Sequence, residues 1–444
     1  MSQHLPRILA VVVAVGLAVP AFAQGAQKPP GRQAQATPSP AVPAAPPPKE
    51  WTGADGASGH PQMTASAIRA AAANFESCLQ GMWPLAAKRN ISRATFDQAI
   101  KGLTPDLRIM DLMDSQPEFS KSIWEYLDIL VNDARVQNGQ AMLAKHKAIF
   151  DKVEQSYGVD RYVITSIWGV ESNYGTLGGD RSVVRSTATL SCVGRRQSYF
   201  RDEFLSALEI LSRGDLRPEQ LKGSWAGAFG PTQFMPTSFK RFAVDGDGDG
   251  RRDVVDSAVD LIASTANNLK KDGWATGQTW GYEVVIPKGF NYMLADRANQ
   301  KTMAEWEALG VKRAGGKAFS RGDDRAYLLL PGGHQGPGFL MMHNFRVIMK
   351  YNPAEAYAMA IGHLADRLRG GAPFVQPWPR HEPSLSLSER REMQELLTRK
   401  GFGLGTATGI FGPKTRAALR SYQVSVGLVP DGFPSAAVLA RLRR

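Results

Sequence analysis

The fold of this chain is decided by a short apolar stretch with a polar end, DRYVITSIWGVE, at residues 160–171. Its pattern predicts a helix with Asp160 as N-cap, because an aspartate before an apolar periodic run satisfies the first free backbone N–H groups. Ile164, Ile167 and Trp168 recur at helical spacing and form one apolar stripe. The next position on this stripe is Glu171. The sequence therefore predicts a core helix that turns a carboxylate towards the protein interior.

The position of Glu171 favours a protonated carboxyl group. Burial in an apolar interior disfavours the anion, so we expect the pKa of Glu171 to be raised. Tyr174 and Gly175 indicate the end of the helix, where the negative end of the helix dipole opposes the charge again. A carboxyl group that keeps its proton near neutral pH suits general acid catalysis. The alternative is an ordinary surface glutamate near a helix end.

Two segments resemble those of lytic murein transglycosylases. The segment GVESNYG at residues 169–175 is similar to the catalytic signature of that family. The glycine-rich stretch GSWAGAFGPTQFMPTS at residues 223–238 offers hydroxyls, an amide and aromatic rings, which together suit sugar binding. It resembles the saccharide groove of the B type, from which Phe229 and Thr237 are mild departures. The resemblance implies that Ser224 and Gln233 hold the substrate and the catalytic glutamate.

Three further segments continue this resemblance to the B type. Arg195 and Arg196 are similar to paired arginines near the family's cleft, where cations suit the carboxylates of murein peptides. An exposed basic pair at a helix end is the alternative for these two residues. Asn352 and Tyr357 match family positions near the reacting sugar, and Tyr357 is a candidate for positioning the acid. Tyr351 is interpreted as a packing residue.

The periodicity predicts a mainly helical α+β domain at residues 63–370. Short apolar runs at residues 282–286, 326–330 and 338–342 are typical of strands and predict a small antiparallel sheet. The family resemblance implies a lysozyme-like transglycosylase domain. A proline-rich linker is expected at residues 371–383.

A small C-terminal domain of three helices is expected at residues 384–444. Its first helix begins at Ser386 with a capping-box pattern, its second starts at Pro413, and its third runs from Ser435 to Leu442. These elements are similar to the three-helix peptidoglycan-binding domain found in many wall enzymes. Thr408 and Pro434 replace the usual Asp and Gly of that pattern.

A run of aspartates at residues 245–256 matches the loop of an EF-hand. Asp245, Asp247 and Asp249 stand at loop positions 1, 3 and 5, and a glycine at position 6 allows the sharp turn. Arg251 would contribute its backbone carbonyl, and Asp256 replaces the usual bidentate glutamate. This spacing predicts one structural Ca²⁺ site. A solvated acidic turn is the alternative, and no organic cofactor is expected.

The N-terminal sequence predicts export. Residues 1–23 have a basic start, an apolar core and a small-residue cleavage site, which together are typical of a signal peptide cleaved after Ala23. The apolar run is too short to span a bilayer, and no cysteine follows it for lipid attachment, so a periplasmic protein without a transmembrane anchor is expected. Residues 24–62 are rich in Pro, Ala and Gln and predict a disordered linker. The two cysteines, Cys78 and Cys192, could pair in an oxidising compartment.

The net charge of +12 favours an anionic polymer as partner. Export excludes nucleic acid and leaves peptidoglycan, with other cell-wall enzymes as further candidate partners.

The residues and the resemblance together predict the reaction. A lytic transglycosylase needs one acid, and we expect Glu171 to act as acid and then as base on the bond between N-acetylmuramic acid and N-acetylglucosamine. The product would be a 1,6-anhydro sugar, formed without water. Two alternatives stay open from sequence alone, namely a hydrolytic muramidase that uses the same glutamate and a murein-binding scaffold without activity.

Overall fold

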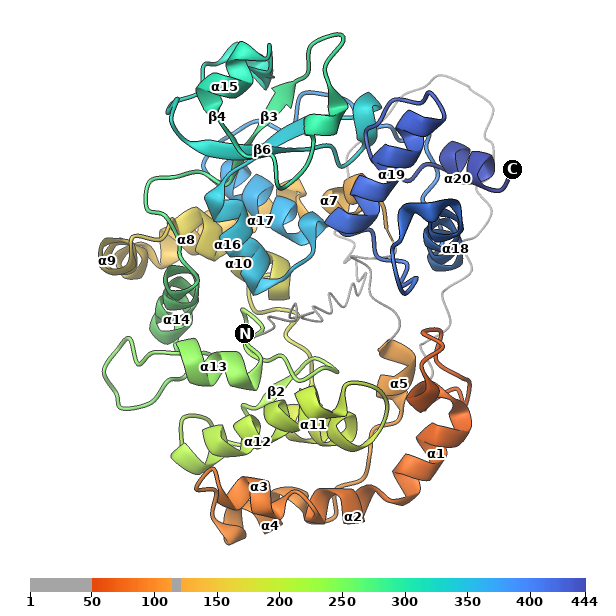
Figure 1. Cartoon of the computed structure of the whole chain (residues 1–444). Coiled ribbons are helices and arrows are strands. Elements are labelled where there is room, and N and C mark those ends of the chain that lie inside the picture. Colours follow the sequence, from red (N-terminus) through yellow and green to blue (C-terminus); the bar gives the residue numbers. More distant parts are fainter. Residues whose placement is uncertain (1–49, 114–120) are drawn as a thin grey trace, which may run out of the picture.

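The computed structural model describes residues 50–113 and 121–444, and the predicted signal peptide and the first part of the predicted 24–62 linker lie outside these residues. Figure 1 shows two helical lobes, a small sheet and a C-terminal three-helix domain. Within the described residues, no helix has both the length and the apolar character needed to cross a membrane.

The first lobe has its own apolar core, made by the N-terminal helices together with two later ones. Cys78 and Cys192 are joined by a disulfide across this core, linking α2 to the end of α11. Its helices are α1 (Ala65–Ala73), α2 (Phe75–Gln80), α3 (Trp83–Ala87), α4 (Arg93–Ile100), α5 (Arg108–Leu112), α11 (Val183–Cys192) and α12 (Gln197–Arg213), preceded by the 3-10 helix η1 (Pro61–Met63).

The second lobe is built around α10 (Arg161–Ser172), whose residues from Val163 to Ser172 are all buried. The Asp160 carboxylate accepts a hydrogen bond from the Tyr162 backbone N–H at 2.9 Å, as expected for the N-cap. The surrounding helices are α7 (Ile123–Leu130), α8 (Asp133–Lys145), α9 (Lys147–Tyr157), α13 (Pro236–Phe242), α14 (Ala258–Lys271), α16 (His343–Tyr351) and α17 (Glu355–Leu368).

The small sheet is antiparallel throughout and has the strand order β4-β6-β7-β3-β5. The three predicted strands are present, each displaced by no more than one residue at either end: β3 (Gly281–Val285), β6 (Arg325–Leu329) and β7 (Gly338–Met341). The sheet also includes β4 (Lys301–Thr302) and β5 (Lys312–Arg313), and it packs with α15 (Met303–Ala308) and the 3-10 helices η2 (Tyr292–Leu294) and η3 (Ala314–Gly316). The 3-10 helix η4 (Gly333–Gln335) lies between β6 and β7 in the chain.

The C-terminal domain contains the three expected helices around a separate core. Ser386 and Glu389 form the reciprocal capping box predicted at the start of its first helix. Its elements are α18 (Leu387–Leu397), the π-helical turn η5 (Thr398–Phe402), α19 (Pro413–Ser425) and α20 (Ala436–Leu442).

Both predicted linkers make specific contacts where the structure describes them. The Thr52 hydroxyl donates to Asp111 at 2.7 Å, so this part of the predicted 24–62 linker contacts the first lobe. In the segment 371–383, Phe374 lies 4.9 Å from Phe339 between ring centroids, and the Gln376 backbone N–H donates to Glu283 at 2.8 Å. This segment is therefore attached to the sheet instead of spanning a gap.

Candidate functional site

Glu171 lies at the last turn of α10 with only 2% of its surface exposed. The Tyr357 hydroxyl, on α17, donates a hydrogen bond of 2.6 Å to Glu171 Oε1. Tyr357 is fully buried, and burial followed by the charge of Glu171 raises its pKa well above 10. The tyrosine therefore keeps its proton and remains a donor to the carboxylate at all pH values relevant to function.

A glycine-rich loop faces the end of α10. The Ser172 hydroxyl donates to the Pro231 carbonyl at 2.5 Å and accepts from the Gly175 backbone N–H at 2.8 Å. The Tyr351 hydroxyl donates to the neighbouring Thr232 carbonyl. Burial, and then the charge of Glu171, raises the pKa of Tyr351 well above 10. Tyr351, interpreted from sequence as packing, thus joins α16 to this loop close to the carboxylate.

Gln233 holds the same loop in an unusual backbone conformation. Its φ of +51° lies in the left-handed region, which side chains other than glycine rarely adopt. The buried side-chain amide donates to the carbonyls of Gly230 at 2.9 Å and Gly178 at 3.1 Å. Gln233 therefore connects the loop to the segment that follows Glu171.

Ser224 lies at the other end of the loop. Its hydroxyl accepts from the Ala228 backbone N–H at 3.1 Å, which closes a tight turn. The short strands β1 (Arg181–Ser182) and β2 (Lys222–Gly223) pair antiparallel and place this turn beside the chain that leaves α10. A Cβ on Gly223 would lie 1.9 Å from the Ala228 carbonyl oxygen, so only glycine fits this close approach.

Asn352 immediately follows α16 and is 1% exposed. Its Oδ1 accepts from the Ala354 backbone N–H at 3.1 Å, whereas its buried Nδ2 has no hydrogen-bond partner within residues 50–113 and 121–444. A buried amide donor left in this state is costly unless a further acceptor satisfies it.

The two arginines make their contacts in the first lobe. Arg195 donates to the Met113 carbonyl at 3.0 Å. Arg196 has a left-handed backbone, and its guanidinium lies 4.3 Å from the Tyr199 ring. Burial lowers the pKa of Arg196. Arg195 and Arg196 therefore lie at the turn between α11 and α12, packed against the first lobe.

Two other glutamates with low exposure are occupied by structural partners. Glu203 accepts from the Thr237 backbone N–H at 2.9 Å and from its hydroxyl at 2.7 Å, which caps α13. Glu355 is paired with Arg297 at 2.7 Å and with Arg416 at 2.9 Å. Burial acts to raise the pKa of Glu355, but the guanidinium charges of Arg416 and Arg297 outweigh it and lower the pKa. Glu171, by contrast, accepts from the Tyr357 hydroxyl and directly precedes Ser172, which donates to the Pro231 carbonyl of the glycine-rich loop.

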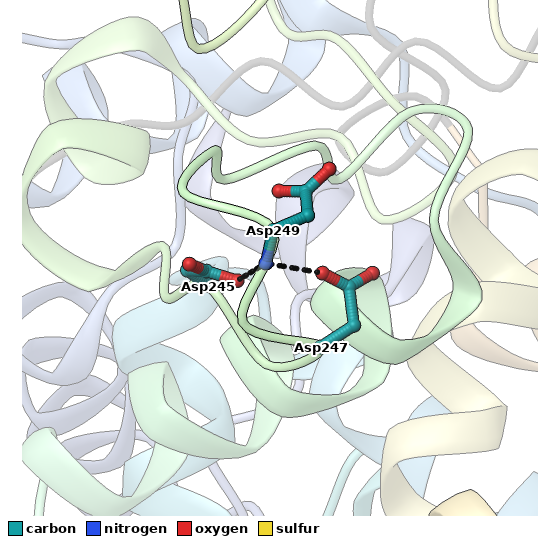
Figure 2. A group of neighbouring side chains, drawn as sticks. All are labelled: Asp245, Asp247 and Asp249. Carbon is teal, nitrogen blue, oxygen red and sulfur yellow. Dashed lines mark hydrogen bonds between the residues drawn. The ribbon is translucent and has the colours of Figure 1, made fainter.

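The aspartate loop brings three of its predicted ligands together. Carboxylate oxygens of Asp245, Asp247 and Asp249 lie within 4.8 Å of one another and are exposed to solvent. Figure 2 shows Asp245 and Asp247 on either side of the Asp249 backbone N–H, with which both form hydrogen bonds. Three hard oxygen donors at this separation fit a Ca²⁺ ion.

The end of the loop differs from the expected ligand set. The carboxylate of Asp256 accepts from Gln220 Nε2 at 2.6 Å and lies 3.8 Å from Arg217, so it does not join the aspartate group. Arg251 directs its guanidinium towards Asp249 at 3.5 Å. Sequence reasoning missed Asp260, which is fully buried and accepts from the Gly246 backbone N–H at 2.7 Å.

Comparison with known proteins defines the class of this fold and site. Residues 74–366 match the family model described as the transglycosylase SLT domain, and residues 386–442 match a peptidoglycan binding domain. The chain therefore belongs to the SLT transglycosylase family. It is a lytic transglycosylase of murein, an enzyme that acts on peptidoglycan.

Individual relatives place the chain within this family. It is 31% identical over 271 residues to the membrane-bound lytic murein transglycosylase B of Escherichia coli K12, covering 58% of this chain and 72% of that protein. The crystal structure of SltB3 from Pseudomonas aeruginosa, in complex with NAG-anhNAM-pentapeptide, is 44% identical with a TM-score of 0.80. It covers 83% of this chain and 99% of that one. The Escherichia coli lytic transglycosylase Slt35 in complex with calcium is 28% identical with a TM-score of 0.56, covering 67% of this chain and 92% of that one.

Proposed function

We propose that Glu171 is the acid and base of a non-hydrolytic cleavage of the glycan strand. The observation that carries this proposal is the 2.6 Å hydrogen bond from Tyr357 to a glutamate that is only 2% exposed. A buried carboxyl group can hold a proton near neutral pH, and a single neutral donor can still stabilise the anion after that proton has left. The same group can thus serve in both halves of the reaction.

The first half breaks the β-1,4 bond between N-acetylmuramic acid and N-acetylglucosamine. Glu171 gives its proton to the glycosidic oxygen, while the muramyl N-acetyl group stabilises the developing oxocarbenium ion. In the second half Glu171 takes a proton from the muramyl C6 hydroxyl, whose oxygen then closes the 1,6-anhydro ring. No water is consumed, and the carboxyl group returns to its protonated state.

Residues around Glu171 position it and bind the sugars. Tyr357 fixes one carboxylate oxygen and stabilises its negative charge. Asn352 offers a buried amide donor that an acceptor of the substrate, such as an N-acetyl carbonyl, would satisfy. The proposed substrate-binding residues are Ser224, Gln233, Arg195, Arg196, Asn352 and Tyr357.

The substrate is inferred to be murein that still carries its peptides. Crystal structures of the 44% identical SltB3 hold NAG-anhNAM-pentapeptide and NAG-NAM-pentapeptide. The first of these contains the anhydro sugar that the proposed reaction would form. The basic composition of this chain suits a strand that bears carboxylates.

We also infer a structural Ca²⁺ ion held by Asp245, Asp247 and Asp249. The crystal structure of Slt35 in complex with calcium supports this inference, as do the three clustered carboxylates in this chain. The ion would neutralise the loop and fix its shape. The predicted signal peptide at residues 1–23 supports a location in the periplasm, where murein is found.

The test of the proposed function is the substitution Glu171→Gln, with Glu307→Gln as the matched control. Glu307 is an exposed glutamate of α15, so the same chemical change there should leave turnover intact. We expect Glu171→Gln to lower kcat by about 10²–10⁴-fold while binding to murein remains. Mass spectrometry of the products released by the unmodified enzyme should show anhydro ends. Products heavier by one water would identify a hydrolase, and full turnover by Glu171→Gln would exclude its catalytic role.

A further inference from the structure

The peptidoglycan-binding domain is fixed to the catalytic domain by buried polar contacts. Glu355, the first residue of α17, is shared between Arg297 of the catalytic domain and Arg416 of α19. Asp431 accepts from the His334 backbone N–H at 3.0 Å and is itself only 7% exposed. Paired contacts at two separate points hold the two domains in one relative orientation.

A cavity of about 300 Å³ lies at this junction. One wall comes from the catalytic domain, at the start of α7 and at residues 353–356, which lead into α17. The other wall comes from the C-terminal domain, at the start of α18 and the turn that precedes α19. In Figure 1, α19 lies beside α7 and α17 at this junction, and α18 lies on the side of α19 away from α17.

The charge of this cavity is positive. Its charged lining consists of Lys121, Arg297, Arg390 and Arg416 against a single carboxylate, that of Glu355. Because Arg297 and Arg416 already compensate Glu355, the positive charges of Lys121 and Arg390 are in excess. An anionic ligand would therefore be favoured.

The remaining lining is mostly apolar and partly open to solvent. Trp124, Ile410, Phe411 and Phe433 contribute to it, and Ile410 is 41% exposed. A pocket that combines apolar surface with a few fixed cations suits a short peptide with small side chains and free carboxylates. The hydroxyls of Ser122 and Ser384 also belong to the lining.

The cavity and the proposed active site share one structural element. Residues Pro353 to Ala356 line the cavity, and Tyr357, the next residue, donates to Glu171. An extended peptide of five residues spans up to ~17 Å. A peptide attached to a sugar near Glu171 could therefore reach the cavity along the start of α17.

We propose that this interdomain cavity binds the peptide stem of the murein strand whose sugars lie at Glu171, an inference that rests on the proposed function. Lys121 and Arg390 pair with the carboxylates of the stem, and the apolar wall covers its small side chains. The peptidoglycan-binding domain thus completes a binding site of the catalytic domain in addition to attaching the enzyme to the wall.

The test compares two double variants in the Glu171→Gln background, each of which replaces one lysine and one exposed apolar residue by glutamate. Lys121→Glu with Ile410→Glu changes two exposed positions of the cavity. Lys400→Glu with Val424→Glu is the matched control, because both positions are exposed on the C-terminal domain and neither lines the cavity. Titration calorimetry with NAG-NAM-pentapeptide should show a Kd raised about tenfold by the first pair and unchanged by the second.

A second measurement separates peptide binding from sugar binding. Cosedimentation with murein whose peptides have been removed by an amidase should be the same for both double variants. The proposal would be overturned if Lys121→Glu with Ile410→Glu left the Kd for NAG-NAM-pentapeptide unchanged. It would also be overturned if this pair weakened binding to stripped murein as much as binding to the pentapeptide ligand. Because binding is measured without turnover, residual activity of Glu171→Gln would count against the proposed function alone.

Discussion

The hydrogen bond between Tyr357 and Glu171 leads to a quantitative prediction for Tyr357→Phe. The substitution removes one hydroxyl from a fully buried side chain and keeps the ring. The lost bond is 2.6 Å long and ends on a carboxylate. Hydrogen bonds to charged groups contribute about 1.5–3 kcal/mol, and one pKa unit corresponds to about 1.36 kcal/mol.

The sign of the effect follows from which protonation state the hydroxyl stabilises. A hydroxyl that donates to a carboxylate favours the anion, so its loss should raise the pKa of Glu171. The proton then becomes harder to release, and kcat should fall by about 10–100-fold near neutral pH. The alkaline limb of the pH–rate profile, where the general acid loses its proton, should move to higher pH.

The assay is turnover of purified murein, measured as soluble anhydro-muropeptides between pH 4 and 9. Tyr327→Phe is the matched control, because Tyr327 is a 2% exposed tyrosine of strand β6 in the same core. The loss of the Tyr327 hydroxyl should change the free energy of unfolding without moving the pH–rate profile. An alkaline limb that stays in place in Tyr357→Phe, or that moves equally in Tyr327→Phe, would refute the assigned role.

Three further predictions concern stability. At free calcium of ~100 times Kd, stability should rise by about 2.7 kcal/mol, seen as a higher Tm; Asp247→Asn should abolish this gain, whereas Asp323→Asn, on an exposed residue, should retain it. Burial and then the charge of Arg367 lower the pKa of His363 to about 4 in the folded protein. As the pH falls below ~6.5, this histidine is therefore protonated in the unfolded chain while it is still neutral in the folded one. The resulting loss of about 2 kcal/mol by pH 5 should be absent in His363→Gln, as measured by urea unfolding at pH 7 and pH 5; an equal loss would contradict it. Replacing Cys78 and Cys192 by serine opens a covalent link across 114 residues and should lower the free energy of unfolding by about 2–4 kcal/mol; an unchanged urea midpoint would count against this.

Local patterns predicted the central helix well. The N-cap at Asp160 and the burial of Glu171 follow from capping preference and apolar spacing, both of which act within a few residues. The strands β4 and β5 were missed because each has only two residues, too few to show an alternation. Their existence depends on pairing with longer strands elsewhere in the chain.

The partners of Glu171 could not be derived from spacing. Tyr357 lies 186 residues further along, and only the family resemblance placed it near the site. Asp256 was expected at the last position of the predicted calcium loop, but Gln220, 36 residues earlier, holds its carboxylate. In both cases the deciding contact comes from a distant element, which a local pattern does not contain.

The position of the glycine-rich loop between two cores explains why Ser224 and Gln233 depend on the whole domain. Trp225 is packed in the core of the first lobe, whereas Phe229 and Phe234 are packed in the core around α10. Any relative motion of the lobes must therefore change the distance between Ser224 and Gln233 or deform the turn that Gly223 allows. Because interiors are close-packed and resist such deformation, the two lobes set the width of the site that faces Glu171.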